Sequence, residues 1–484
     1  MISQHRIGLF LGPALFFLIY GLIPNSFMPR AACQVLAITA WISAWWVSEA
    51  LPIPVTSLLP LSLFPLMGVM NIAEAAQPYI SPIIFLFIGG FILALALEKW
   101  NLHRRIALNI ISLVGTKGSQ LVLGFMLATG FLSMWISNTA TTMMMVPIAM
   151  AIIFQLLELQ SDPKEQSRVR RMGKALILCI PYAATIGGLA TLVGTPTTLI
   201  FAGFVEKTYG VDVDFGSWLK IGLPVSLVLL PFAWWVLVKV AFRMQPVSIQ
   251  GGRAAIDQEL STLGSMKREE LWVLVVFGLV AVAWMLRSVL LKPWLPGIHD
   301  SIIALIGATL LFVIPSQEKG KPLMDWETAQ RLPWGILLLF GGAFSVAKAF
   351  EVSGLVSWMA EQFDQLAFVG LLGLLFIMVG LINFLTEIVQ NMATITLMLP
   401  VLAALAPALE VHPYFLMVPI CFASSCAFML PFATAPNAIA FGSNYLEMKD
   451  MIRAGFWINV GSILLISLLG YFFLPNVWTF PPLP

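Results

Sequence analysis

Long apolar runs, separated by short polar or charged segments, make up most of this chain. The runs 7–24, 175–193 and 455–474 approach or exceed the roughly 20 residues that an α-helix needs to cross the hydrocarbon core of a bilayer. A transmembrane β-barrel would instead alternate apolar and polar positions in segments of about ten residues, and the sequence shows no such alternation. The pattern predicts an all-α polytopic membrane protein.

The apolar runs between charged loops predict eleven transmembrane helices. The predicted spans lie near 7–24, 31–50, 52–70, 82–99, 175–206, 217–242, 270–290, 299–314, 334–350, 414–443 and 455–474. Two further apolar stretches, 119–156 and 366–408, are each too long for a single span. Each must cross twice or enter the membrane and turn back, and we expect two re-entrant hairpins.

Composition agrees with this pattern. The chain has 484 residues, of which 59% are apolar and 10% charged, whereas soluble domains are roughly half apolar and about a quarter charged. The four cysteines lie in apolar surroundings without a CxxC motif or a Cys/His spacing that binds metal. We therefore expect buried thiols. The net charge of +2 says little about partners, because the charge is segregated by side of the membrane and is not pooled into a basic patch, and we expect no nucleic-acid partner.

Basic residues concentrate in alternate loops. Lys and Arg are frequent in the segments 99–117, 164–174 and 239–268, whereas the loop 351–365 carries acids and almost no bases. Because short cytoplasmic loops are rich in Lys and Arg, this distribution predicts a cytoplasmic N-terminus and a C-terminus outside. We expect a multi-pass protein of the inner (plasma) membrane, with the lipid bilayer as its surroundings.

Two pairs of segments indicate an internal repeat. IIFLFIGGFILALALEKW at 83–100 resembles GILLLFGGAFSVAKAFEV at 335–352, and SNTATTMMMVP at 137–147 resembles QNMATITLMLP at 390–400. Both pairs have nearly the same spacing, and an odd number of crossings separates their members. The two halves therefore face opposite ways, as in the inverted-topology repeats of secondary transporters, whose substrate sites lie near the midplane between the repeats.

The two polar motifs stand in the two long stretches. Asn138 lies close to the middle of 119–156, so that a re-entrant hairpin places it at the tip, where a helix N-terminus attracts anions without Lys or Arg. TIGGLATLVGTPTTLI at 185–200 and MLPFATAPNAIAFGSN at 429–444 contain Gly and Pro that interrupt their spans. Two tips and two broken helices would converge on one cavity. The alternative is that these Ser, Thr and Asn only form hydrogen bonds between helices.

Four segments together resemble the divalent anion/sodium symporter family: SNTATTMMMVP, GTPTTLI, TEIVQNMATITLMLP and ATAPNAIAFGS. The resemblance covers nearly the whole chain. It implies a sodium-coupled symporter that imports C4-dicarboxylates such as succinate, malate or fumarate. It also implies a homodimer in which a transport domain slides across the membrane against a scaffold, the elevator mechanism.

The resemblance also implies a division of the chain into four parts. The scaffold comprises 1–118, with spans 1–4, and 244–365, with spans 7–9. The transport domain comprises 119–243, with the first hairpin, broken span 5 and span 6, and 366–484, with the second hairpin, broken span 10 and span 11.

Site residues follow from the family motifs, residue by residue. The implied sodium ligands are Ser133, Ser137, Asn138 and the carbonyl of Gly194 at one site, and Thr386, Asn391 and the carbonyls of Val389 and Ala433 at the other. The implied substrate residues are Asn138, Thr139, Asn391 and Thr434, with Thr195 and Pro196 shaping the wall. Sodium is a hard cation that favours such oxygens, and bound cations would offset the charge of a dianion.

The second motif departs from the family pattern. Where the family shows Ser-Asn-Thr twice, this chain has Gln390, Asn391 and Met392. Met392 has no hydroxyl for a carboxylate, which removes one hydrogen bond on that side. Glu387, also in the second hairpin, is an intramembrane acid. We favour a carboxylate that is hydrogen-bonded to a helix end or to unwound backbone, with proton coupling as the alternative.

Other functions remain to be weighed against symport. Within transport, the alternatives are a citrate or other tricarboxylate symporter, a 2-oxoglutarate symporter, and a sodium-independent dicarboxylate exchanger. A channel would be expected to carry a repeated carbonyl filter or a charged ring, which the motifs lack. An enzyme is disfavoured because the sequence has no HExxH, GxSxG or Walker A motif.

Overall fold

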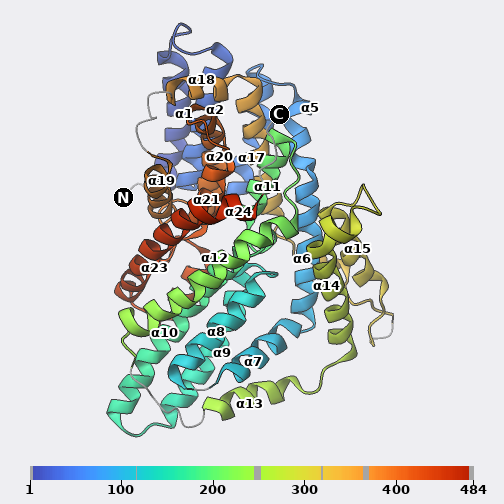
Figure 1. Ribbon diagram of the computed structural model, residues 1–484, viewed down its shortest axis with the longest axis vertical. Helices are drawn as coiled ribbons and strands as arrows, with labels where there is room; N and C mark the ends of the chain where they lie inside the picture. Colours follow the sequence, from blue (N-terminus) through green and yellow to red (C-terminus); the bar gives the residue numbers. More distant parts are fainter. Residues whose placement is uncertain (1–3, 116, 245–251, 318–319, 364–369, 479–484) are drawn as a thin grey trace.

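A computed structural model describes residues 4–115, 117–244, 252–317, 320–363 and 370–478 (Figure 1). Within these residues every regular element is a helix, and the only β-type pairing is an isolated bridge between Pro315 and Pro322. The prediction of an all-α membrane protein is confirmed, because eight described helices are long and apolar enough to span a bilayer and six shorter helices are also apolar. Eleven as the number of spans stays a prediction.

Helices α1 to α5 form one end of the molecule in Figure 1, together with α17 and α18, whereas α6 leads away from this end and α7 lies near the opposite end. The bounds of the N-terminal helices are α1 Gln4–Leu22, α2 Arg30–Ser48, α3 Ile53–Thr56, α4 Leu59–Leu66, α5 Ile72–Ala76, the 3₁₀ turn Gln77–Ile80, α6 Pro82–Lys99 and α7 Leu102–Val114. The terminal residues 1–3 lie outside the described part of the chain.

Two features of this region were not predicted. The expected span 52–70 is not one helix but the two short helices α3 and α4. Pro60 accounts for the break, since its ring clashes with the carbonyl of the residue four positions earlier, Thr56, at which α3 ends. The charged segment 99–117, expected to be a loop, contains the amphipathic helix α7, which buries Leu102, Leu108 and Ile111.

The next group of helices contains the first polar motif and the first broken span. It consists of α8 Gly118–Ser133, α9 Asn138–Glu158, α10 Pro163–Gly188, α11 Pro196–Tyr209 and α12 Phe215–Trp235, which continues as a π-helix over Val236–Ala241. The stretch 119–156 therefore turns at 134–137, next to Asn138, and the span 175–206 is interrupted between Gly188 and Pro196. Both predicted breaks are confirmed, and re-entry into the membrane stays a prediction.

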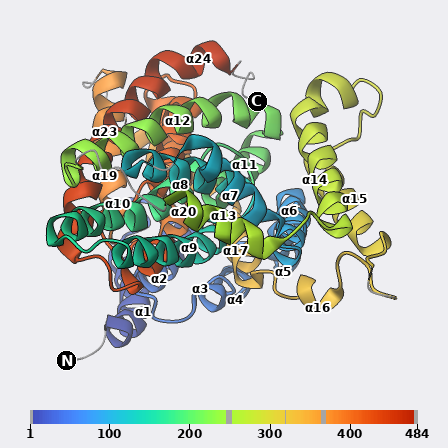
Figure 2. The same ribbon diagram turned by 90° about the horizontal axis from the view of Figure 1, so that it is seen from below.

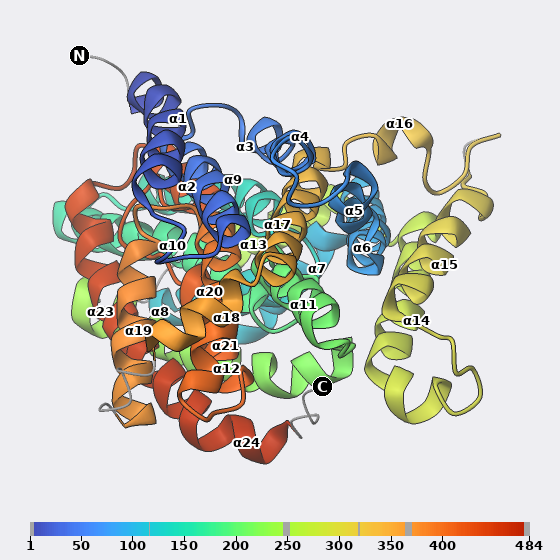
Figure 3. The same ribbon diagram turned by 90° about the horizontal axis from the view of Figure 1, so that it is seen from above.

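The middle of the chain includes an arm beside the main bundle, formed by α14 and α15. The elements of this part are α13 Gly252–Leu263, α14 Arg268–Leu286 with the π-helical turn Arg287–Leu291, α15 Asp300–Val313, α16 Trp326–Ala329, α17 Trp334–Val352 and α18 Leu355–Phe363. Figures 2 and 3 show α14 and α15 standing apart from the other helices, with α6 as their neighbour. The approach to α6 is close, because a Cβ at Gly89 would lie 2.6 Å from the Cβ of Ala304.

Charged side chains attach this arm to the rest of the molecule. The Arg287 side chain is 2% exposed, and it lies 2.6 Å from the carboxylate of Asp212, in the loop before α12, and 3.1 Å from that of Asp300. Lys99, at the end of α6, forms an ion pair with Asp325 before α16. The Lys99 ammonium holds the pKa of the Asp325 carboxyl well below its usual range.

The last helices repeat the plan of the second group. They are α19 Leu371–Leu385, α20 Asn391–Ala408, α21 Tyr414–Ser425, α22 Ala435–Gly442 and α23 Met448–Leu468, followed by the π-helical turn Leu469–Phe473 and α24 Leu474–Val477. The second motif again begins a helix at its Asn, and the span 414–443 is again broken, between Ser425 and Ala435. The predicted boundary at 365/366 and the C-terminal residues 479–484 lie outside the described residues.

The buried apolar side chains form two clusters. The larger joins α6 to α15 with α19 to α23, and the smaller joins α1 to α5 with α17, α18 and the start of α20. Met392, in the second polar motif, packs against both clusters. The start of α20 therefore lies where the two hydrophobic cores meet.

Candidate substrate and cation site

A cavity of about 230 Å³ lies between the two polar motifs and the two helix breaks. It is lined by Phe91, Ser137, Asn138, Thr139, Thr185, Thr195, Pro196, Thr197, Ile336, Gln390, Asn391, Met392, Phe432, Ala433, Thr434, Ala435 and Pro436. All six residues expected to contact substrate are among them. Of the eight expected sodium ligands, Ser137, Asn138, Asn391 and Ala433 line the cavity, whereas Ser133, Gly194, Thr386 and Val389 do not.

Four helices begin at this cavity. Their N-cap residues are Ser137 of α9, Thr195 of α11, Gln390 of α20 and Thr434 of α22, and all four line it. Helix N-termini carry partial positive charge and free N–H groups. No Lys, Arg or His occurs among the described residues that line the cavity. The arrangement therefore suits an anion that is held by helix ends instead of by a cationic side chain.

Only two of these four N-cap residues cap their helix with a side-chain hydrogen bond. The Ser137 hydroxyl accepts a hydrogen bond from the Ala140 amide at 3.2 Å, and the Thr434 hydroxyl accepts one from the Asn437 amide at 3.3 Å. Neither Thr195 nor Gln390 forms a side-chain cap. The first turns of α11 and α20 thus keep amide donors that a ligand can use.

The first half-site is built around Asn138. Ser133, at the end of α8, donates a hydrogen bond from its hydroxyl to the Asn138 side-chain oxygen at 2.5 Å. A Cβ at Gly188 would lie 2.6 Å from that same oxygen and 3.0 Å from the Gly194 carbonyl oxygen. A Cβ at Gly194 would lie 2.9 Å from the Ser133 carbonyl oxygen. The missing side chains allow hydroxyl, amide and carbonyl oxygens to gather, which is the donor set that a hard cation prefers.

The Gly188 carbonyl was not among the expected ligands. It lies 2.5 Å from the position of a Cβ on Gly194, so it belongs to the same group of oxygens. The sequence carried a signal for it, because Gly187 and Gly188 were expected to interrupt the span and free their carbonyls.

The first unwound segment, 189–195, is fixed by hydroxyl groups. Thr191 donates from its hydroxyl to the Met134 carbonyl in the hairpin turn and accepts from the Gly194 amide at 3.1 Å. Thr198 donates to the Leu192 carbonyl at 2.8 Å. These neutral hydrogen bonds hold the first broken helix against the first hairpin.

The second half-site repeats the central hydrogen bond. Thr386 donates from its hydroxyl to the Asn391 side-chain oxygen at 2.7 Å, and the same hydroxyl lies 2.7 Å from the Ser424 carbonyl oxygen. The Asn391 side-chain amide lies 3.4 Å from the Ser425 carbonyl oxygen. Val389, expected to offer its carbonyl, belongs to the smaller hydrophobic cluster. The two halves meet directly at Thr197 and Ser425, whose hydroxyl oxygens are 2.6 Å apart.

Glu387 holds the second unwound segment, 426–434. Its buried carboxylate accepts hydrogen bonds from three successive backbone amides, those of Phe428 at 2.7 Å, Met429 at 2.9 Å and Leu430 at 3.0 Å. The Asn459 side chain on α23 donates a fourth bond at 2.7 Å. The favoured interpretation of Glu387, a carboxylate that satisfies unwound backbone, is confirmed.

The two unusual residues of the second motif occupy distinct places. Gln390 donates from its side-chain amide to the Glu49 carboxylate at 2.9 Å. Glu49 caps the C-terminus of α2 in a left-handed conformation with φ 48°. Met392 lines the cavity next to Asn391. The tip of the second hairpin therefore contacts the N-terminal helices, a contact that the sequence did not predict.

Several other residues that line the cavity were not predicted from the sequence. Phe91 on α6 and Ile336 on α17 bring apolar side chains to the cavity from outside both hairpins. A signal was present, since these residues belong to the two matched segments 83–100 and 335–352 of the internal repeat. Phe432 and Thr185 were also not singled out.

Comparison with known proteins gives one family and several similar chains. The family described as "Sodium:sulfate symporter transmembrane region" matches residues 5–479. A Staphylococcus saprophyticus protein named sodium-dependent dicarboxylate transporter SdcS is 46% identical over 475 residues, which cover 97% of this chain and 92% of that protein. A protein of the same name from Staphylococcus aureus strain USA300 is 45% identical over 479 residues, which cover 98% of this chain and 92% of that protein.

Among solved structures, the crystal structure of the YdaH transporter of Alcanivorax borkumensis is similar with a TM-score of 0.56. The match covers 99% of this chain and 100% of that chain at 14% sequence identity. At this identity the likeness supports the arrangement of helices and carries nothing about substrate.

Proposed function

Since the chain belongs to the sodium:sulfate symporter family over residues 5–479, we propose that it is a sodium-coupled symporter that imports C4-dicarboxylates such as succinate, malate or fumarate. Membership confirms the resemblance to the divalent anion/sodium symporters, and its relatives are named as transporters, not enzymes. One observation carries the proposal: four helix N-termini converge on one small cavity whose described lining has no cationic side chain.

The cavity has two polar ends for the two carboxylates. Asn138 and Thr139 bind one carboxylate, and Asn391 and Thr434 bind the other, while Thr195 and Pro196 shape the wall between them. The volume of about 230 Å³ supports a small substrate, since pockets for drug-sized ligands begin at about 300 Å³. Met392, Phe91 and Ile336 supply apolar surface for the carbon chain of the acid.

Sodium ions provide the positive charge that the cavity lacks. One ion binds the oxygens of Ser133, Asn138 and Gly194, with Ser137 at the hairpin tip. A second ion binds near Thr386 and Asn391, with the carbonyls of Val389 and Ala433. A dianion is costly to hold in a medium of low dielectric constant unless cations accompany it. Departure of the ions then favours release of the acid, and this couples transport of the acid to transport of sodium.

Transport proceeds by an elevator movement within a homodimer. The parts 119–243 and 366–484 form the moving domain, and the parts 1–118 and 244–365 form the scaffold. The position of the cavity supports this division, because Phe91 and Ile336 of the scaffold parts face the polar residues of the moving parts. A movement of one against the other would open the cavity to one side of the membrane at a time. The orientation with the N-terminus in the cytoplasm belongs to the same proposal.

Uptake into proteoliposomes tests the proposal. Purified protein is reconstituted, and uptake of radiolabelled succinate is measured with an inward sodium gradient and with an equal potassium gradient. We expect accumulation only with sodium. Succinate uptake that is unaffected by sodium would remove the symport hypothesis, and uptake that instead needs an internal dicarboxylate would identify an exchanger.

Competition identifies the acid. Unlabelled C4, C5 and C6 acids, with sulfate in parallel because of the family description, compete with labelled succinate under the sodium gradient. We expect the C4 acids to compete most strongly, because the cavity is small. Stronger competition by citrate or by 2-oxoglutarate would assign the transporter to tricarboxylates or to C5 acids.

A further inference from the structure

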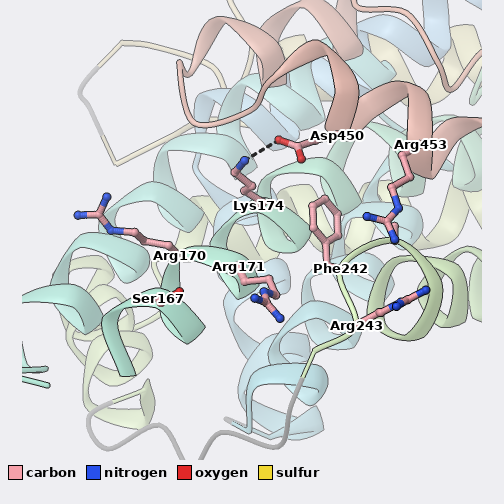
Figure 4. Close-up of a pocket in the computed structure, with 9 residues that line it drawn as sticks. Ser167, Arg170, Arg171, Lys174, Phe242, Arg243, Asp450 and Arg453 are labelled. Carbon is pink, nitrogen blue, oxygen red and sulfur yellow. Dashed lines mark hydrogen bonds and ion pairs between the residues drawn. The ribbon is translucent and has the colours of Figure 1, made fainter. Parts of the chain in front are cut away.

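A second polar cavity, of about 470 Å³, shares no lining residue with the substrate cavity and is lined by basic side chains. It is formed by the first turns of α10, the chain after the π-helix that ends α12, and the first turns of α23. Its residues are Ser167, Arg170, Arg171, Lys174, Ala241, Phe242, Arg243, Asp450 and Arg453 (Figure 4). These three chain segments belong to the side that the distribution of Lys and Arg predicts to be cytoplasmic.

The cavity holds more positive charge than its acids neutralise. Lys174 is occupied, since its ammonium lies 2.8 Å from the Asp450 carboxylate and 2.9 Å from that of Glu447. The arginines of the cavity, in contrast to Lys174, have no carboxylate partner among the described residues. These arginines are Arg170, Arg171, Arg243 and Arg453, and the ion pairs of this region involve other basic side chains. The cavity therefore offers guanidinium groups to an anion.

The arginines lie around two buried apolar residues. In Figure 4, Phe242 lies at the centre, Arg171 and Arg243 lie below it, and Arg453 lies beside it, while Arg170 extends away from them. Phe242 and Ala241 are buried. Arg243 has a backbone φ of 44°, a left-handed conformation that is unfavourable for a residue with a Cβ. The chain thus accepts backbone strain at one of the arginines that border the cavity.

Exposed apolar side chains extend from the cavity along α23. Arg453, Trp457, Val460 and Leu464 are spaced four, three and four residues apart, so they share one face of the helix. Trp457 is 48%, Val460 41% and Leu464 50% exposed. An arginine therefore stands at the end of an apolar stripe on a helix long enough to cross the membrane.

The end of α12 repeats this arrangement. Trp235, the last residue of α12, is 49% exposed; the basic residue Lys239 follows in the π-helix, and Arg243 follows in the chain after it. α12 packs against α23, as a Cβ at Gly461 would lie 2.0 Å from the Phe232 ring. Two neighbouring helices thus present apolar surface that ends in basic side chains at one cavity.

We propose that this cavity binds the headgroup of an acidic phospholipid of the surrounding leaflet, with the phosphate at Arg243 and Arg453 and an acyl chain along Trp457, Val460 and Leu464. Arg is well suited to phosphate because its guanidinium donates two parallel hydrogen bonds. Basic pockets between transmembrane helices on the cytoplasmic side bind acidic headgroups by this chemistry. A soluble anion would use the arginines but not the apolar stripes, and for that reason the lipid is favoured. The proposal does not depend on the transported substrate.

Lipid binding is measured by native mass spectrometry of the purified full-length protein in detergent. The protein is titrated with phosphatidylglycerol and, separately, with phosphatidylcholine of the same acyl chains. We expect the wild-type protein to retain phosphatidylglycerol at least about tenfold more strongly. Arg243→Gln/Arg453→Gln should lose about fivefold in affinity for each arginine, or about 25-fold in total.

A matched control removes the same charge elsewhere. Arg253→Gln/Arg268→Gln changes two exposed arginines on α13 and α14, outside the cavity, and should leave phosphatidylglycerol binding within about twofold of wild type. Equal losses in both double variants would overturn the proposal. If Arg243→Gln/Arg453→Gln does not fold, the single variant Arg243→Gln is measured instead and should lose about fivefold.

Inorganic phosphate distinguishes a lipid from a soluble anion. Excess phosphate should leave phosphatidylglycerol bound to the wild-type protein, because phosphate has no acyl chain to contact Trp457 and Val460. Release of the lipid by phosphate would assign the cavity to a soluble anion and overturn the lipid proposal. Trp457→Ser should weaken phosphatidylglycerol binding while leaving any binding of phosphate unchanged, and an unchanged lipid affinity would contradict the acyl-chain contact.

Discussion

The two half-sites share one hydrogen-bonded frame but are supported in different ways. In both, a hydroxyl five residues before the motif Asn donates to its side-chain oxygen, from Ser133 to Asn138 and from Thr386 to Asn391. The broken helix beside the first frame is held by the neutral hydroxyl of Thr191. The broken helix beside the second is held by the buried carboxylate of Glu387.

The difference follows from the backbone that each segment leaves unpaired. The second unwound segment, 426–434, is longer than the first, 189–195, and it presents three successive amides to one point. One carboxylate can accept all three bonds, whereas a hydroxyl cannot. The comparison teaches that two segments can share the same hydrogen-bonded frame while each satisfies its own unwound backbone with a different side chain. Substitutions in both halves test this comparison.

The largest effect is expected for Glu387→Ala. It removes the hydrogen-bond partner of three successive backbone amides, one buried and two partly buried, at a cost of about 3 kcal/mol, whereas Thr191→Val in the first half should cost about 1–2 kcal/mol. We expect little folded protein for Glu387→Ala and a moderately destabilised transporter for Thr191→Val. Thermal unfolding in detergent and sodium-driven succinate uptake measure the two effects. Glu158→Ala, at an exposed acid of α9, is the control.

The variant Glu387→Gln distinguishes a structural role of the carboxylate, as an acceptor for backbone amides, from a role in proton coupling. The Gln oxygen can still accept amide hydrogen bonds, so we expect partial recovery of folding and of uptake relative to Glu387→Ala. A Glu387→Gln protein that is as stable as wild type but has lost the pH dependence of its uptake would favour proton coupling instead. Unchanged stability of Glu387→Ala would contradict the supporting role of the carboxylate.

The next largest effect is expected for Asn138→Ala. Its side chain lines the cavity and is held in place by Ser133, and in the proposed function its loss removes bonds to both sodium and substrate. Bonds to charged groups contribute about 1.5–3 kcal/mol each, which corresponds to a loss of uptake of roughly tenfold to 100-fold for one bond and background uptake for both. Asn391→Ala should lose less, because the Asn391 amide already lies near the Ser425 carbonyl.

Expression and folding must be unchanged for this comparison to hold. Asn109→Ala, at an exposed Asn on α7, is the matched control and should transport normally. Near-normal uptake by Asn138→Ala would remove the first half-site from the proposed mechanism. A larger loss for Asn391→Ala than for Asn138→Ala would reverse the order of the two half-sites.

The smallest effect is expected for Met392→Thr. It restores at the second half-site the hydroxyl that Thr139 provides at the first, so one additional hydrogen bond can form with substrate. We expect the KM for succinate to fall by about fivefold, the equivalent of about 1 kcal/mol, with little change in the sodium concentration for half-maximal uptake. Met143→Thr, at a 61% exposed Met of α9, is the control. A change in sodium dependence without a change in KM would mean that Met392 belongs to the cation site.

Much of the fold was predictable because its signals are local. Apolar runs identified most of the long apolar helices, and the prolines and glycines at 187–196 and 431–436 identified the broken helices. The break at Pro60 was missed because a hydrophobic run of the right length concealed it. The helix α7 was missed since its charged residues outweighed its narrow apolar face.

The sequence by itself determined the motifs, their duplication and the polar residue types that a cation and a dianion need. These are properties of neighbouring residues, and they can be read along the chain. The tertiary structure alone decided that four N-caps from distant segments share one cavity, that Glu387 reaches the amides of 428–430, and that Gln390 meets Glu49. These contacts join residues from about 40 to 340 positions apart. Only the packing of the helices determines which distant side chains face one another.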